Sequence, residues 1–466
     1  MSFHTLLFPI AALPCILILW ALAPRRWKDP VLVLLSLLLY AWGSPICAII
    51  LLISILFNFF VGKRIVLAEA KQRKRSLLLF GLAGNLLLLL AARYWPVLWS
   101  VFGGTADTAA GLLTYSVIGT GFFTLSALSY LFDLYRAQEA LPASLTGCAL
   151  YLSFFPKLFG GPVILYRDMA PQLQNHPIRA EKALAGGRRF LIGLAKKVLL
   201  SNQLSRVFFS VTSMHPGRIS LVTAWIGALS YGLMLYYDLS GYADMAIGLG
   251  GIFGFTLPEN FNYPLASKSL NEFWSRWHST LGGWFREYVF EPLGGNHGRR
   301  SKTLRNLILA WLLVGLWHGI NWTFLVWAIY SAGLLALEAL VLDHRLSRLP
   351  GWLRRGLTLL LVFLGWSFFF SPDVGTGLTY FHRMIGIFTV PFADDGATYY
   401  LRSSWLILLI ALIGGLPVVR GLCQSVMQSK HLVLQGVAVI VFGVLLWFCI
   451  AAMVSAPNAI LFYPQF

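Results

Sequence analysis

Charged residues are scarce in this chain, and acidic residues are the scarcest. Of the 466 residues, 12% are charged and 58% are hydrophobic, with 18 Asp and Glu against 36 Lys and Arg. Soluble proteins carry about 25% charged residues. This deficit excludes an ordinary soluble enzyme, a disordered chain and a coiled coil. Apolar runs recur along most of the length, so the sequence predicts one all-α polytopic membrane domain over residues 1–466.

Cysteine pairs are also missing. The five cysteines lie in or beside apolar runs without a CxxC spacing. We therefore expect small buried hydrophobic residues, with no disulfide framework, no metal site and no bound cofactor. A P-loop and a GxSxG elbow are absent, and no strand precedes the glycine-rich residues 248–254, which argues against a dinucleotide site.

The apolar segments that could cross a bilayer begin near the N-terminus and continue to the end of the chain. A break at Ser240–Gly241 is expected to separate two spans, Ile219–Tyr237 and Gly241–Phe255. The fourth segment carries Asn85 and Arg93, so it is either broken or longer than the bilayer. The predicted spans are Thr5–Ala23, Pro30–Gly43, Pro45–Val61, Ser76–Phe102, Gly111–Phe132, Arg189–Val211, Ile219–Tyr237, Gly241–Phe255, Leu304–Trp317, Trp322–Leu342, Gly356–Phe370, Ser404–Val419 and Leu432–Val454.

The net charge of +18 is concentrated between these runs. Segments 25–28, 63–75 and 135–189 are basic, and basic loops face the cytoplasm. Cations follow the first apolar run and none precedes it, so we expect a retained first span with a periplasmic N-terminus. This distribution also argues against nucleic-acid binding. The basic segment 299–305 can face the cytoplasm only if residues 269–293 cross or re-enter the membrane. Such a segment would have irregular backbone, which is tolerated at membrane depth only inside protein or along a water-filled cavity.

His318 is the strongest candidate for chemistry because no charged residue occurs between Arg305 and Glu338. Gly315 and Gly319 would let other groups approach closely. A buried neutral imidazole can act as a general base. The alternative is a packing histidine that donates to a carbonyl group. The tryptophans expected to wall this ring are Trp311, Trp317, Trp322 and Trp327.

Residues 269–295 form an amphipathic segment at helical spacing. Phe273, Trp277, Leu281 and Trp284 share one predicted face, whereas Asn271, Ser275 and His278 share another. The segment is either an interfacial helix or a re-entrant helix that lines a pocket.

A second polar group lies in residues 235–250, where Asp238, Ser240, Tyr242 and Asp244 occur together. Carboxylates at membrane depth need partners, and we expect Lys268, Arg276 or Arg286 to supply them. A structural ion pair is favoured over a catalytic role.

Several ordered motifs resemble the membrane-bound O-acyltransferase family, and most closely its bacterial alginate O-acetyltransferase branch. Similarity covers about residues 25–340, with residues 341–466 as additional membrane helices. The strongest matches are Tyr237-DLSGYADMAIG-Leu249, Leu257-PENFNYP-Leu265, Phe273-WSRWHSTLGGWFREYVFEPLGG-Asn296 and Gly315-LWHGINWTF-Leu325. Two positions depart from the pattern: a further histidine after Trp327 is absent, and Leu165 stands at an arginine position.

The resemblance implies a ring of about 11–13 tilted helices with re-entrant segments around a central tunnel. It places the catalytic histidine on His318 and the second family position, often Asn or His, on His278. The residues expected to contact substrate or donor are Asn271, Trp274, Arg276, Trp317, Asn321, Asp238 and Tyr242.

The implied reaction moves acetyl groups from a cytoplasmic donor, acetyl-CoA, across the bacterial inner membrane toward an exported polysaccharide, through a periplasmic SGNH-type partner. Two alternatives stay open: a transporter or export component without acyl chemistry, and a lipid or protein acyltransferase of the same family.

Overall fold

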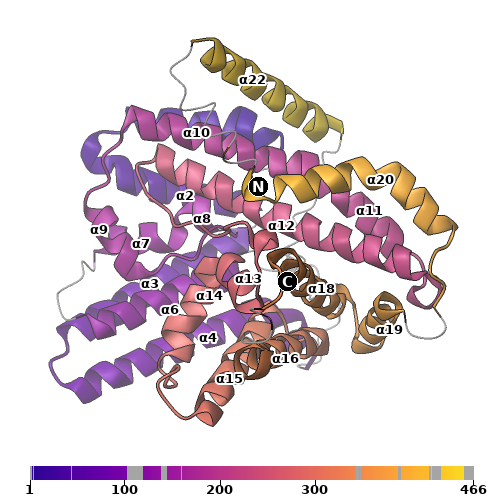
Figure 1. Cartoon of the computed structure of the whole chain (residues 1–466). Helices are drawn as coiled ribbons and strands as arrows, with labels where there is room; N and C mark the ends of the chain where they lie inside the picture. The colour runs from indigo at the N-terminus through magenta and orange to yellow at the C-terminus, as the bar shows by residue number, and fades with distance from the viewer. Residues whose placement is uncertain are drawn as a thin grey trace. The chain divides into compact units, whose positions relative to one another are not determined.

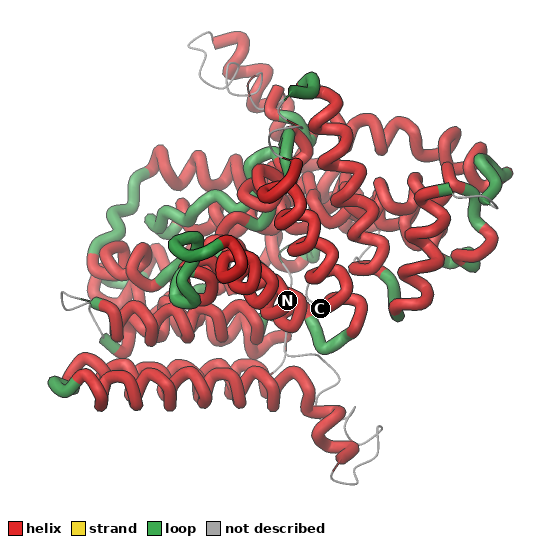
Figure 2. The backbone as a smooth tube through the Cα atoms, turned by 60° about the horizontal axis from the view of Figure 1, so that its bottom comes forward, coloured by secondary structure: helices red, strands yellow, loops and turns green. Residues whose placement is uncertain are grey.

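The computed structural model describes residues 3, 5–43, 45–101, 119–137, 144–158, 160–342, 346, 348–386, 390–418, 421 and 432–455. Within these residues every regular element is a helix and no strand occurs (Figure 2). The prediction of an all-α protein is confirmed. The chain divides into two compact units, one built from Met1–Phe190 and Tyr242–Pro258, the other from Leu191–Gly241 and Glu259–Ser455.

The first unit contains a group of long helices and several short ones (Figure 1). Its elements are η1 (Phe8–Ala12), α1 (Leu13–Leu22), η2 (Arg25–Trp27), α2 (Lys28–Gly43), α3 (Pro45–Leu67), α4 (Lys71–Val101), α6 (Thr120–Arg136), α7 (Leu145–Ser153), α8 (Phe155–Leu158) and α9 (Tyr166–Gln174). Helix α10 (Ala180–Ala195) passes from this unit into the second.

Helices α3, α4 and α6 lie against one another in the first unit (Figure 1). Asn58 of α3 and Asn85 of α4 exchange side-chain hydrogen bonds of 3.0 and 2.8 Å, which satisfies both buried amides. Helix α4 is continuous over 31 residues, about 46 Å at 1.5 Å per residue. Of the two alternatives for Ser76–Phe102, the structure shows the longer, unbroken helix.

The second unit contains the remaining elements. These are η3 (Lys196–Ser201), α11 (Asn202–Thr212), η4 (Pro216–Arg218), η5 (Pro264–Ala266), α13 (Leu270–Arg276), α14 (Ser279–Phe285), η6 (Arg286–Phe290), α15 (Arg300–His318), α16 (Trp322–Leu337), η7 (Glu338–Leu342), α18 (Gly351–Phe370), α19 (Val374–Ile385), α20 (Asp395–Gly414) and α22 (Leu432–Ser455). Helix α12 (Leu221–Ile252) starts in this unit and ends in the first.

The expected break at Ser240–Gly241 is wrong, because α12 runs through it without interruption. A Cβ added at Gly241 would lie 2.7 Å from the carbonyl oxygen of Gly193. This glycine therefore serves close packing against the neighbouring helical segment, a role that local sequence does not distinguish from a helix break.

Six described helices are long and apolar enough to cross a membrane, which agrees with a polytopic protein. They are Pro45–Leu67, Lys71–Ala92, Trp322–Val341, Gly351–Phe370, Asp395–Gly414 and Val433–Ser455. A shorter apolar helix covers Phe8–Leu22. The first part of the predicted span Gly111–Phe132 lies outside the described residues.

The cysteines agree only in part with the sequence analysis. Cys47, Cys148 and Cys449 are buried, as expected, whereas Cys15 is exposed. Cys423 lies outside the described residues.

Candidate functional site

His318 is the last residue of α15, at a sharp connection between two helices. Gly319 caps α15, and the side chain of Asn321 accepts a hydrogen bond of 3.1 Å from the Thr323 N–H to begin α16. A Cβ at Gly315 would lie 2.9 Å from both the Ala328 Cβ and the Phe324 carbonyl oxygen. The predicted role of Gly315 is confirmed: it allows α15 and α16 to approach closely enough to enclose the His318 ring.

Aromatic rings surround the His318 imidazole, which is 7% exposed. Its ring centroid lies 5.0 Å from Trp317 and Phe369, 5.5 Å from Trp327 and 6.1 Å from Phe324. The sequence identified the two tryptophans. Phe369 was missed because it lies on α18, 51 positions further along the chain.

Of the other two tryptophans predicted to surround His318, Trp311 packs against neighbouring rings and Trp322 is exposed. Trp311 lies one ring further away, 5.5 Å from Trp327 and 4.9 Å from Trp274 of α13. Trp322 is 75% exposed, so its assignment to the wall is wrong. It is the first residue of α16 and points to the outside of the helix pair. The rings of Trp274, Trp311 and Trp327 thus link α13 to the neighbourhood of His318.

His278 lies at a break between two short helices. Helix α13 ends at Arg276, α14 begins at Ser279, and His278 has the left-handed backbone angles φ 45° and ψ 46°. The continuous helix assumed in the sequence analysis is therefore wrong. The expected apolar face is nevertheless buried in both helices: Phe273, Trp277, Leu281 and Trp284 are at most 7% exposed.

The expected polar face of this segment is split by the break. His278 is 5% exposed, and its ring packs 5.8 Å from Phe261. Asn271 and Ser275 are exposed instead. Burial lowers the pKa of His278, so its imidazole is neutral at pH 7. A neutral imidazole can both donate and accept a hydrogen bond.

The strained turn at His278 is held by the preceding segment 259–262. The N–H of Asn262 donates to the Arg276 carbonyl at 3.0 Å, and the N–H of Ser279 donates to the Asn260 carbonyl at 2.9 Å. The Asn260 side-chain oxygen also accepts from the Thr280 hydroxyl at 2.8 Å and from the Thr280 N–H at 3.3 Å. Asn260 is 1% exposed. The sequence analysis missed this residue, although its motif was noted.

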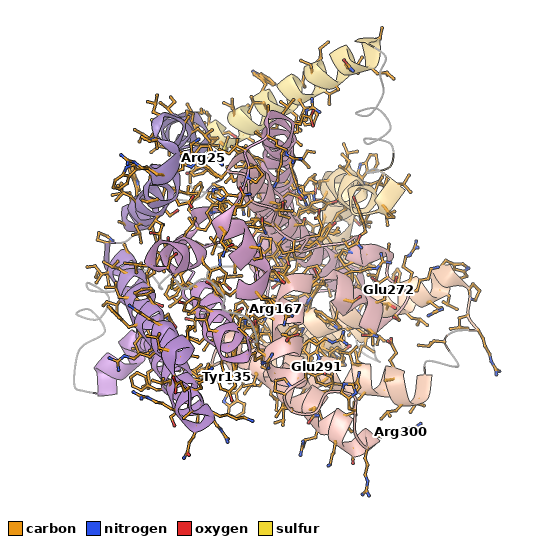
Figure 3. All side chains as sticks on the ribbon, turned by 90° about the vertical axis from the view of Figure 1, so that its left-hand side faces the viewer. Arg25, Tyr135, Arg167, Glu272, Glu291 and Arg300 are labelled. Carbon is orange, nitrogen blue, oxygen red and sulfur yellow. The ribbon has the colours of Figure 1, made fainter. Side chains whose placement is uncertain are left out.

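The remaining predicted contact residues have local partners. Arg276 pairs with Glu272 one turn earlier at 2.6 Å; Glu272 extends from α13 in Figure 3. Asn321 caps α16 and also donates to the Pro372 carbonyl at 3.2 Å. These side chains belong to the second unit, with both histidines, Trp274 and Trp317.

Asp238 and Tyr242 each have partners of their own. Asp238 is fully buried and pairs with Lys197 at 2.5 Å, in the second unit. Tyr242 belongs to the first unit, where its ring stacks on Phe3 at 4.9 Å. There Asp244 pairs with Arg189 at 2.8 Å. The partners expected for the two carboxylates, Lys268, Arg276 and Arg286, are therefore wrong, because the cations come from the preceding helical segment.

Among the described residues no group of three or more His, Cys, Asp and Glu side chains could hold a metal ion. The site thus consists of the His318 imidazole and the aromatic rings around it. Trp274 connects these rings to the segment that leads to His278. Such an arrangement can bind an uncharged group and exchange a proton.

A family model described as the membrane-bound O-acyltransferase family matches residues 38–372. The chain belongs to this family. It is therefore an O-acyltransferase and a multi-pass membrane protein.

Three relatives support the same branch. "Probable alginate O-acetylase AlgI" of Azotobacter vinelandii is 35% identical over 388 residues, 80% of this chain and 76% of the relative. The protein of the same name from Pseudomonas aeruginosa is 33% identical over 403 residues, 84% and 76% of the two chains. "Peptidoglycan O-acetyltransferase" of Helicobacter pylori is 31% identical over 425 residues, 83% and 80% of the two chains.

Proposed function

We propose that this O-acyltransferase moves acetyl groups from cytoplasmic acetyl-CoA across the inner membrane toward an exported polysaccharide. One observation carries the proposal: in a chain of this family, His318 is enclosed by Trp317, Trp327, Phe324 and Phe369 at the junction of α15 and α16. The names of the relatives, which refer to alginate and peptidoglycan, support an acetyl group and a glycan acceptor.

Two mechanisms use His318 in this place. As a general base, its imidazole takes the proton of the acceptor hydroxyl while the hydroxyl oxygen attacks the thioester carbonyl, giving an ester and the CoA thiol. As an acyl carrier, an imidazole nitrogen attacks the thioester and releases the CoA thiolate, and the acceptor hydroxyl then takes the acetyl group. In either mechanism His278 and Asn271 orient the donor or stabilise the negative charge on the carbonyl oxygen.

The direction of transfer follows from the loops between the helices. Basic segments attract the CoA phosphates on the cytoplasmic side. Arg300, at the first turn of α15, is exposed and extends away from the ribbon (Figure 3). The N-terminus is then periplasmic, and a separate SGNH-type acetyltransferase in the periplasm completes the transfer to the polymer.

The proposal is tested with labelled acetyl-CoA supplied to the cytoplasmic face of membrane vesicles. His318→Ala is expected to abolish acetyl transfer while protein level and polymer export stay unchanged. His382→Ala is the matched control, because this histidine lies exposed on α19. Transfer that survives His318→Ala would contradict the mechanism and favour a transporter. Preferential use of long-chain acyl-CoA would instead indicate a lipid or protein acyltransferase.

A further inference from the structure

The carboxylate of Glu338 makes contacts that neither the motifs nor the helical pattern of the sequence indicated. Glu338 follows α16 directly and is 7% exposed. Its Oε2 accepts a hydrogen bond of 2.7 Å from the Leu270 N–H, and its Oε1 accepts one of 3.0 Å from the Asn271 N–H. Both oxygens of a buried glutamate are thus directed at the first two amides of α13.

Helix α13 has only seven residues, a length at which an isolated helix is not stable in water. The first amides of a helix have no partner inside it. In α13, Glu338 supplies acceptors for the first two. Ser269 supplies the next two, its hydroxyl oxygen for Glu272 at 3.1 Å and its carbonyl for Phe273 at 2.9 Å.

The carboxylate of Glu338 lies at the N-terminal end of α13. Its two oxygens face the N–H dipoles of the first two residues of α13. A carboxylate at a helix N-terminus interacts favourably with the positive end of the helix dipole, and hydrogen bonds to an ionised acceptor are about twice as strong as neutral ones. Loss of this charge is therefore expected to weaken the contact between α13 and Glu338 more than loss of a neutral capping side chain would.

The two helices that Glu338 connects both reach the candidate site. Trp327 of α16 lies 5.5 Å from His318, and Trp274 of α13 lies 5.8 Å from Trp327. Two residues after α13 the chain reaches His278. The hydrogen bond between Glu338 and Leu270 therefore fixes the position of α13 along α16.

We infer that Glu338 is a positioning residue for acyl transfer, acting by fixing α13, and with it Trp274 and His278, relative to His318. This inference rests on the proposed function. The carboxylate itself does not contact the reacting groups, so its loss is expected to lower kcat with little effect on the KM for acetyl-CoA.

The test compares Glu338→Gln, which keeps the size and removes the charge, with Glu338→Asp, which keeps the charge on a shorter side chain. Glu338→Gln should lower kcat at least about 10-fold, since a displacement of about 1 Å in an active site can cost 100-fold. Hydrogen exchange of the amides of residues 270–276 should accelerate. Glu338→Asp should restore part of both. Glu291→Gln is the control, because Glu291 is half-buried and pairs with Arg286 in a turn outside the site.

An unchanged kcat in Glu338→Gln overturns the inference, whatever the rate of amide hydrogen exchange in α13. Faster exchange with full activity would mean that Glu338 has only a structural role. If Glu338→Gln does not accumulate, Glu338→Asp decides: faster exchange of residues 270–276 together with an unchanged kcat overturns the inference. Acetyl transfer that persists in His318→Ala shows failure of the proposed function, and the exchange rates of α13 then still report whether Glu338 holds this helix.

Discussion

Asn260→Ala tests whether the backbone turn at His278 matters for catalysis. The substitution removes the acceptor of two hydrogen bonds from Thr280 and leaves the backbone bond from Ser279 in place. Each lost bond costs about 1 kcal/mol, and the space left at a residue that is 1% exposed adds to this. We expect a loss of about 2–3 kcal/mol in the free energy of unfolding.

The effect on activity should exceed what this loss of stability explains. His278 is held in a left-handed conformation that costs roughly 1–2 kcal/mol, so a weakened turn relaxes toward the ordinary helical region and moves the imidazole. We expect kcat to fall about 10–100-fold at temperatures where the protein stays folded. Acetyl transfer from labelled acetyl-CoA measures kcat, and titration with a denaturing detergent measures the unfolding free energy.

Thr280→Val is the matched variant, because it removes the hydroxyl and keeps the N–H bond to Asn260. It should cost about 1 kcal/mol, and the double variant should show a coupling energy of about 1 kcal/mol. Asn260→Asp keeps side-chain oxygen acceptors and should restore part of the activity. The reasoning is refuted if Asn260→Ala unfolds more easily but keeps the full kcat, or if the two substitutions are additive.

Three further predictions concern helix ends and buried groups. Burial raises the pKa of Asp394, but hydrogen bonds from the Thr223 hydroxyl and from backbone N–H groups outweigh it and lower the pKa. Its stabilising effect is therefore present above the unfolded pKa of about 3.9 and is lost as the pH falls through the folded pKa. Asp394→Ala should cost about 1–2 kcal/mol at pH 7 and less near pH 3, whereas Asp373→Ala, at an exposed cap, should have a smaller effect in the same unfolding assay. Burial also lowers the pKa of Lys157 to about 7, so unfolding stability should rise from pH 7 to pH 9 in the unmodified protein and stay level in Lys157→Met; a rise of equal size in both would contradict this. Gly315→Ala should separate α15 from α16 and cost about 1–3 kcal/mol, and full acetyl transfer by this variant would show that the close approach is not needed.

The long apolar helices could be predicted because their signal is local. Pro45, Trp322 and Leu432 each begin both a predicted span and an observed helix. His318 was identified in the same way, since a single ionisable residue in an apolar segment stands out without knowledge of the fold. Gly315 followed from its position one turn earlier.

The errors and omissions concern contacts between segments distant in sequence. The periodicity of Phe273 to Trp284 contains no sign of the break at His278, because the bonds that hold the turn come from residues 259–262. Gly241 has the same local signature whether it interrupts a helix or packs against Gly193. Phe369 contacts the His318 ring from α18, and Glu338 contacts the start of α13 from the end of α16. Only the tertiary arrangement produces these contacts.

The left-handed backbone at His278 limits which amino acids can replace it. Beyond glycine, asparagine, aspartate and histidine occupy this region several times more readily than other types, and β-branched side chains are nearly excluded. The family resemblance gives asparagine or histidine at this position. The conformation of the turn is compatible with either side chain: histidine and asparagine differ in chemistry but share a tolerance of this region of main-chain conformation.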